Sequence, residues 1–275
     1  MNLPTQADAV IIGAGAFGLA TAWNLSNLGV ERVVVLDRFA PGSQTSPRAA
    51  GLFKLIQADE TRTRVSQLAI ETVCSFELRT GVPLAVERSG SLLMARTPEH
   101  GRLIEHEAAQ SAAWGVELEL VDEARARALM PVIEGGGFSA ICHIPGDVYI
   151  EEPASLIAAW LTALEARGVS VIGHAPVIGI TRDDGAVSGV VTPAGAINTP
   201  VVVDAAGAWA RAVGDLASAS VPVCPVRHQL LISEPLAGVQ AGQPILRIID
   251  SGVYIRPARG GLMFGGFESD PLPFD

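Results

Sequence analysis

Three glycines and one acid near the start of the chain have the spacing of a phosphate-binding turn. Gly13, Gly15 and Gly18 form the pattern G-x-G-x-x-G, and Asp37 follows 19 residues after the last glycine. The first glycine permits a tight turn, the second lets the backbone approach a pyrophosphate, and the third lets a helix pack closely against a strand. An acid at that distance can accept hydrogen bonds from ribose hydroxyls. These residues therefore predict a dinucleotide site.

The segments around the glycines have the pattern that such a site needs. The run AVII at 9–12 predicts a buried strand, a helix is expected over about 16–28, and VVVL at 33–36 predicts a second buried strand. The amino end of the helix would offer free N–H groups and its positive dipole end to the phosphates. The acid disfavours the 2′-phosphate of NADP, but it does not separate NAD from FAD.

The rest of the chain alternates between helical and β-rich stretches. Helices are expected over 60–80, 100–114 and 122–130, and from Pro153 to Gly168. The turns at 183–185 and 193–195 join short strands into an antiparallel meander, and the chain is β-rich again after Ser218. The fold class predicted is α/β, with a Rossmann-like parallel sheet and antiparallel meander in one domain and a β-rich α+β second domain. The first domain would comprise 1–85 and 140–218, and the second 86–139 and 219–275.

Composition excludes several classes of partner. The 275 residues are 49% hydrophobic and carry a net charge of -10, which argues against nucleic acid and against an anionic membrane surface. Cys74, Cys142 and Cys224 are far apart and lack metal spacing, so free thiols and no metal site are expected. The first apolar run is too short for a membrane span and lacks the charged start of a signal peptide. A cytoplasmic protein is predicted.

Five stretches together resemble one family. They are VIIGAGAFGLATAWNLSNLG, VVVLDR, GSQTSPRAAGL, PVIGI and VVVDAAGAWA, in that order. The chain is similar over nearly its whole length to the FAD-dependent amine and amino-acid oxidoreductases, the family of D-amino-acid oxidase, glycine oxidase and sarcosine oxidase. PVRHQLLIS followed by VYIRPARGGLMFGGFES looks most like the sarcosine and dimethylglycine branch. The resemblance implies that the dinucleotide is FAD.

The resemblance also implies roles for single residues. The pyrophosphate turn would include Ala16 and Phe17, and the adenosine ribose would meet Asp37 and Arg38. The flavin would lie along a loop that contains Thr45, Ser46, Pro47, Arg48 and Leu52. Adenine would meet the backbone of Val177, and the backbone at Ala206 and Gly207 would come close to the cofactor.

The chain departs from this family in two respects. In the dimethylglycine branch, a histidine bonded covalently to the flavin stands at the position of Arg48. Since arginine cannot form that bond, non-covalent FAD is expected. Members of the family usually continue well beyond the point that corresponds to residue 275. A fragment, a truncated gene product or one piece of a split enzyme, completed by a partner chain, is therefore expected.

The family oxidises a carbon–nitrogen bond, and the resemblance implies where the substrate lies. His228 matches a histidine beside the substrate, and Tyr254 matches a tyrosine near flavin and substrate. A substrate carboxylate would need a cation. The candidates are Arg48, Arg227, Arg256 and Lys54, with Arg256 favoured because a strand would turn it to the same side as Tyr254. His228, Tyr254 and Arg256 are the predicted catalytic residues.

Other functions stay open at this point. An NAD-linked dehydrogenase would explain the first 38 residues, but simple NAD domains continue as repeated βαβ units rather than as an antiparallel meander. A truncated dinucleotide-binding fragment without turnover is the third alternative. The sequence specifies neither the amine, nor whether oxygen or an electron carrier reoxidises the flavin, nor the oligomeric state.

Overall fold

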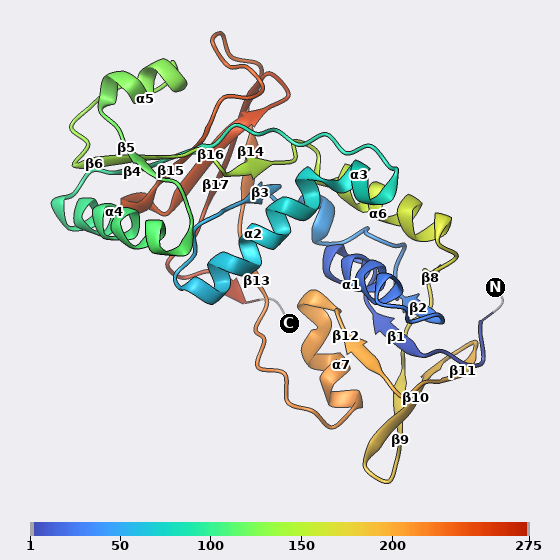
Figure 1. Cartoon of the computed structure of the whole chain (residues 1–275). Helices are drawn as coiled ribbons and strands as arrows, with labels where there is room; N and C mark the ends of the chain where they lie inside the picture. Colours follow the sequence, from blue (N-terminus) through green and yellow to red (C-terminus); the bar gives the residue numbers. More distant parts are fainter. Residues whose placement is uncertain (1–2, 274–275) are drawn as a thin grey trace.

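Two β-sheets of different type, each covered by helices, organise the chain (Figure 1). A computed structural model describes residues 3–273. One sheet is parallel and has four strands, and the other has seven strands and is mostly antiparallel. The predicted α/β class is confirmed.

The parallel sheet has the strand order β12-β1-β2-β8. Its strands are β1 (Ala9–Ile12), β2 (Val33–Leu36), β8 (Ser170–Ile172) and β12 (Val202–Asp204). Helix α1 (Ala16–Asn27) connects β1 to β2, as the sequence predicted. Every residue of β1 and β2 is buried, which explains their unbroken apolar runs.

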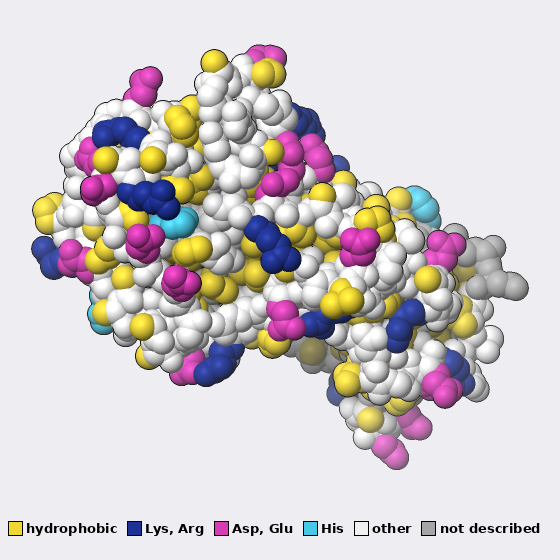
Figure 2. Space-filling model, turned by 45° about the horizontal axis from the view of Figure 1, so that its top comes forward, with side chains coloured by type: hydrophobic (Ala, Val, Ile, Leu, Met, Phe, Trp, Pro, Cys, Tyr) yellow, Lys and Arg dark blue, Asp and Glu magenta, His cyan; other side chains and the backbone are white. Residues whose placement is uncertain are grey.

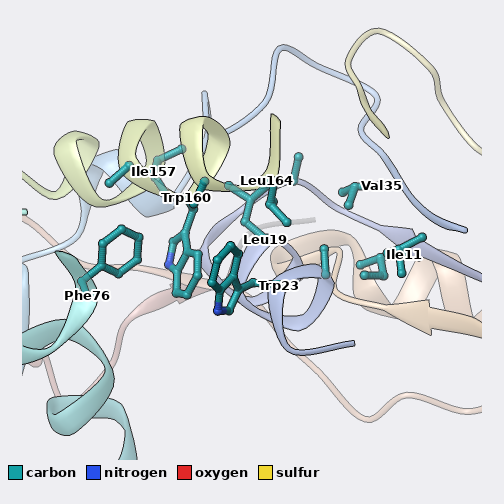
Figure 3. Close-up of a cluster of buried hydrophobic side chains, with 13 residues drawn as sticks. Ile11, Leu19, Trp23, Val35, Phe76, Ile157, Trp160 and Leu164 are labelled. Atoms are coloured by element: carbon teal, nitrogen blue, oxygen red, sulfur yellow. The ribbon is translucent and has the colours of Figure 1, made fainter. Parts of the chain in front are cut away.

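Helix α6 (Pro153–Ala166) packs on α1 over this sheet. Figure 3 shows Trp23 of α1 beside Trp160 of α6, with Phe76 on the far side of Trp160. The ring centroids of Trp23 and Trp160 are 5.9 Å apart, and those of Phe76 and Trp160 are 4.6 Å apart. Each such aromatic pair contributes about 0.5–1.5 kcal/mol beyond the area it buries. This core packs α1, which directly follows the glycine turn, against the parallel sheet.

The predicted antiparallel meander is confirmed as a separate three-stranded sheet. It has the order β11-β10-β9, with β9 (Gly179–Asp183), β10 (Ala186–Thr192) and β11 (Gly195–Asn198). The two turns expected from the sequence connect these strands.

The seven-stranded sheet has the order β14-β17-β16-β15-β4-β6-β5. Its strands are β4 (Ser91–Ala95), β5 (Glu119–Leu120), β6 (Ala140–Ile144), β14 (Leu230–Ile232), β15 (Ile245–Ile248), β16 (Val253–Ala258) and β17 (Gly261–Gly266). Helix α4 (Pro98–Ser111) packs on one face and α5 (Glu123–Leu129) on the other. Side chains of β4 therefore alternate between the two helices.

The remaining elements are short or peripheral. They are α2 (Glu60–Cys74), α3 (Phe76–Thr80), α7 (Ala210–Leu216), the 3-10 turns η1 (Ser46–Arg48), η2 (Ala112–Trp114), η3 (Gly207–Trp209) and η4 (Ile249–Ser251), and two strand pairs, β3 (Leu52–Phe53) with β7 (Val148–Tyr149) and β13 (Val226–Arg227) with β18 (Leu272–Pro273).

One expected helix is divided in two. The helix expected over 60–80 breaks at Ser75, whose hydroxyl donates to the carbonyl of Glu71 at 2.6 Å. A serine bonded in this way competes with the helical backbone. The second piece ends at Gly81, which has a left-handed φ of 74°.

The division into two domains stays a proposal. It placed residues 140–218 with the dinucleotide site, but β6 pairs with β4 over five positions in the seven-stranded sheet. Strand pairing therefore favours moving that boundary from 140 to a point after Ile144.

The surface has mixed charge. On the face in Figure 2, Lys and Arg side chains are scattered among Asp and Glu rather than gathered in one patch. In the part of the chain that the structure describes, no helix is long and apolar enough to cross a membrane. Residues 3–273 also contain no group of three or more His, Cys, Asp or Glu side chains that could hold a metal ion.

Candidate functional site

The carboxyl ends of β1, β2 and β12 meet at one edge of the parallel sheet. The amide of Gly13 donates to the carbonyl of Leu36 at 2.8 Å, and the amide of Ala205 donates to Ile12 at 2.9 Å. The chain leaves β1 toward β2 on one side, while β12 lies on the other. In open α/β sheets, ligands bind in the crevice at such a reversal of strand order. The glycine turn, Asp37 and the segment after β12 are therefore brought together.

The three glycines of the turn have different surroundings. Gly13 has a φ of +112°, and a Cβ atom there would lie 2.3 Å from the carbonyl oxygen of Ala205. A Cβ on Gly18 would lie 1.8 Å from the carbonyl oxygen of Gly13. These two positions exclude any side chain through packing alone. A Cβ on Gly15 would meet only the hydroxyl of Ser46, at 3.0 Å, so packing restricts this position much less.

The amino end of α1 is suited to an anion. Gly15 is the capping residue and supplies no side chain, and the first turn holds no acid. The hydroxyl of Ser46 accepts a hydrogen bond from the amide of Ala16 at 3.1 Å. Phe17, the next residue, is 83% exposed. The other N–H groups of the first turn, beyond the Ala16 amide that Ser46 occupies, and the positive end of the helix dipole favour phosphate at this position.

Asp37 closes the other side of the turn. Its carboxylate accepts from the amides of Ala14 and Phe39, each at 2.8 Å. An ionised carboxylate has about four lone-pair positions, so acceptor capacity remains for ribose hydroxyls. The guanidinium of Arg38 lies over the ring of Phe39, 5.1 Å from its centroid.

The predicted flavin loop begins beside the turn. Thr45 caps the short helix η1, whose first residue is Ser46. Arg48 ends η1 and donates to the backbone carbonyls of Ser43 and Gln44, which turns its side chain back onto its own loop. Leu52 follows in β3, paired with β7.

Three further predicted cofactor residues lie near the same edge. The amide of Ala175, two residues before Val177, donates to the carbonyl of Asp37 at 2.8 Å. Ala206 donates its amide to the carboxylate of Asp204 at 3.0 Å, and Gly207 has a left-handed φ of 57°. Burial raises the pKa of Asp204. This acid beside the turn was not singled out in the sequence.

A second cluster lies on the seven-stranded sheet and is aromatic. The ring of Phe267 lies 5.4 Å from that of His228 and 5.6 Å from that of Tyr254, measured between centroids. Tyr254 lies over Gly265, where a Cβ would come within 2.2 Å of the tyrosine ring. Burial raises the pKa of Tyr254. The structure thus brings together two of the predicted catalytic residues.

His228 also contacts an acid that the sequence patterns did not predict. Its Nδ1 atom is hydrogen-bonded to the carboxylate of Glu268. This bond is the main reason that the pKa of Glu268 lies below its usual value. The two residues are 40 positions apart, and no local pattern in the sequence links them.

The surroundings of Arg256 do not favour the predicted contact with a substrate carboxylate. The residue has 0% exposure, and its guanidinium donates to the carbonyls of Ala50, Glu151 and Pro257 at 2.8, 2.8 and 2.7 Å. It also lies over the ring of Tyr149. Strand alternation predicted the side to which Arg256 turns, but not that backbone carbonyls occupy its donors. Arg256 joins β16 to the loop before β3.

A buried charged cluster lies beside Tyr254 and was also missed. Asp147 is fully buried and accepts from the hydroxyl of Ser91 and from Arg247, which stands opposite Tyr254 in the β15–β16 pairing. Burial and the charge of Arg247 lower the pKa of Lys54. These residues come from separate segments, so only the folded chain reveals the cluster.

Comparison with known proteins matches the chain to one family and to several relatives. The family model described as "FAD dependent oxidoreductase" matches residues 8–275. Human mitochondrial sarcosine dehydrogenase is 35% identical over 282 residues, covering 98% of this chain and 30% of that protein. Rat mitochondrial dimethylglycine dehydrogenase is 30% identical over 268 residues, covering 96% and 31%. The chain therefore spans about 30% of the length of these curated relatives.

Solved structures agree with the fold. L-proline dehydrogenase from P. horikoshii superposes with a TM-score of 0.89 at 23% identity, covering 98% of this chain and 71% of that one. Glycine oxidase from Geobacillus kaustophilus gives a TM-score of 0.83 at 22% identity, covering 98% and 73%. At these identities the likeness concerns the fold alone.

Proposed function

Because the chain belongs to the family of FAD-dependent oxidoreductases, we propose that it binds FAD and oxidises the carbon–nitrogen bond of a small amine or amino acid. Sarcosine and dimethylglycine define the proposed substrate class, since two of the relatives are named for them. The observation that carries the proposal is the amino end of α1, where Gly15 provides no side-chain cap, beside Ser46 and Asp37 at the edge of a parallel sheet.

The residues at this edge fit the dinucleotide. The amides of the first turn of α1 beyond Ala16 would bind the pyrophosphate, and the absence of a side chain at Gly15 would let it approach. Asp37 would accept from the ribose with the lone pairs that its two amide bonds leave free. Arg38 and Val177 are the remaining proposed contacts of the adenosine half, and the backbone at 206–207 is proposed to come close to the cofactor.

The flavin half would lie along the loop at 45–52. Arg48 is bonded to two carbonyls of its own loop, and its guanidinium has no chemistry for a covalent flavin link. Non-covalent FAD is therefore proposed. When bound, FAD would accept the two electrons of the oxidised carbon–nitrogen bond.

The chain's own residues would prepare the substrate. An amine must be neutral at nitrogen before it can lose electrons, so a base is needed beside it. His228 is proposed to take that proton, and Tyr254 to hold the substrate through its hydroxyl. Lys54 stays a candidate for a substrate carboxylate, because its amine lies among the charges around Asp147. Arg256 is the less favoured candidate, because its guanidinium is bonded to three backbone carbonyls.

Several further predictions accompany this function. Reoxidation by oxygen or by an electron carrier, and completion of the fold by a partner chain, stay proposals. A cytoplasmic location is also only a proposal, and two of the relatives are named as mitochondrial.

An anaerobic mixing experiment tests the activity. The purified chain is loaded with FAD and mixed with sarcosine or with dimethylglycine, and the long-wavelength flavin absorbance is followed. The absorbance should be lost, and His228→Gln should slow its loss about 100-fold or more while FAD stays bound. His106→Gln, on the exposed side of α4, is the matched control. A flavin spectrum that neither amine changes would contradict the proposed function.

A further inference from the structure

His228 and Glu268 come together through strand pairing. Leu230 of β14 stands opposite Gly265 of β17, so the residues just before β14 lie beside the residues just after β17. Nδ1 of His228 is hydrogen-bonded to a carboxylate oxygen of Glu268. The side chains are 28% and 46% exposed, so neither is locked inside the core.

The chemistry of the two partners fixes which atom carries the hydrogen. An ionised carboxylate only accepts hydrogen bonds, so the partner nitrogen must donate. The bond to His228 lowers the pKa of Glu268, which keeps this carboxylate ionised near neutral pH. In a neutral imidazole, one nitrogen donates and the other accepts. With the hydrogen on Nδ1, the lone pair of His228 is on Nε2.

We propose that Glu268 is a positioning residue that holds His228 with its hydrogen on Nδ1, so that Nε2 takes the proton of the substrate amine. The inference rests on the proposed function. It adds Glu268 as the residue that orients His228, the proposed base. The N–H bond of the substrate ammonium breaks, an Nε2–H bond forms, and the amine keeps its electron pair. The carboxylate of Glu268 then lies against the imidazolium, whose charge it stabilises.

An aromatic ring also lies beside the pair. Phe267 meets His228 nearly edge to face, with an angle of 79° between the rings. The same ring contacts Tyr254. Phe267 therefore contacts both rings and lies between the imidazole and the tyrosine, while Glu268 selects the tautomer.

Nuclear magnetic resonance of the full chain tests the tautomer without cofactor or turnover. Histidine labelled with ¹⁵N gives long-range correlations that identify the protonated nitrogen, and His228→Gln assigns the signal among the five histidines. The unchanged chain should show the hydrogen on Nδ1. Glu268→Gln and Glu268→Ala should move part or all of it to Nε2. Asp270→Asn removes a charge from the same segment and should leave the signal unchanged.

Kinetics of flavin reduction by dimethylglycine give the second measurement. Glu268→Gln should slow reduction about tenfold or more at saturating amine, while Asp270→Asn should not. A hydrogen on Nε2 in the unchanged chain would overturn the inference, as would an unchanged reduction rate in Glu268→Gln. If neither amine reduces the unchanged chain, the proposed function fails, and the tautomer measurement still decides the role of Glu268.

Discussion

Gly15 and Gly18 belong to one motif, but their surroundings give them different tasks. Gly18 lets α1 approach β1, because a Cβ there would lie 1.8 Å from the carbonyl of Gly13. Gly15 has an ordinary φ of −85° and meets only Ser46. The absence of a side chain at Gly15 therefore leaves room for a ligand at the helix end and is not needed for packing within the protein.

Substitution by alanine should separate these two tasks. Gly15→Ala should leave the unfolding temperature nearly unchanged and weaken FAD binding about tenfold, which corresponds to ~1.4 kcal/mol. Gly18→Ala should lower the free energy of unfolding by about 1–3 kcal/mol through overpacking. Thermal unfolding and an FAD titration measure the two effects. Gly179→Ala, where the nearest contact is an ordinary 3.6 Å, is the control. Equal FAD affinity in Gly15→Ala and the unchanged chain would refute the assignment.

Single residues were predicted well where the motif is local. The glycine turn, Asp37 and Ser46 lie together as expected, because the βαβ unit that positions them is continuous in sequence. Glu268 and Phe267 were missed, since their contacts with His228 depend on the register of β14 and β17. The full burial of Arg256 was not predicted, because alternation along a strand gives the face and not the depth of burial.

At the scale of elements, Arg256 links the seven-stranded sheet to the loops beside the β3–β7 pair. Its three carbonyl acceptors belong to the loop before β3, to the loop after β7 and to β16 itself. The loop before β3 is the one that would follow the flavin. A single buried guanidinium therefore holds this loop against the seven-stranded sheet.

Removal of that guanidinium should cost stability. Arg256→Met leaves three buried or partly buried carbonyl groups without their donor and should lower the free energy of unfolding by about 2–3 kcal/mol. Arg259→Met breaks an exposed ion pair with Glu152, which solvent screens, and should cost much less. Urea unfolding measures both variants. Similar losses in the two variants would show that Arg256 does not link the seven-stranded sheet to these loops as described.

The start of α4 gives a dependence on pH. Burial raises the pKa of Asp250, but hydrogen bonds from the amides of Arg96 and Thr97 outweigh it and lower the pKa to about 2, from 3.8. A depressed pKa stabilises the folded state above pH 3.8, and that contribution is lost as the pH falls toward 2. The stability difference between the unchanged chain and Asp250→Asn should therefore shrink over this range, as followed by thermal unfolding. A difference independent of pH would argue against this role.

Elements were predicted more reliably in type than in extent. Helix α4 begins at Pro98 rather than at His100, because Thr97 caps it and proline is favoured in the first turn. The break at Ser75 depends on one side-chain bond that the apolar spacing does not reveal. Strand β6 joins the seven-stranded sheet through pairing with a partner distant in sequence.

At the scale of the whole molecule, the two sheets hold different groups of predicted site residues. The parallel sheet presents the dinucleotide edge, and the seven-stranded sheet presents His228 and Tyr254. The alternating composition of the sequence predicted these two types of sheet, while contacts between distant segments, such as those of Arg256 with the loops before β3 and after β7, required the structure. The chain spans about 30% of its sarcosine and dimethylglycine dehydrogenase relatives, so FAD binding by these residues is the central claim.

The visible absorbance spectrum of the purified chain tests that claim most directly. The chain is mixed with FAD and separated from free flavin by gel filtration, and the spectrum of the protein peak is recorded. A flavin spectrum that travels with the folded protein, and that is weakened in Gly15→Ala, is the predicted result. A folded protein peak without flavin, with all FAD eluting separately, would show that these residues do not bind FAD.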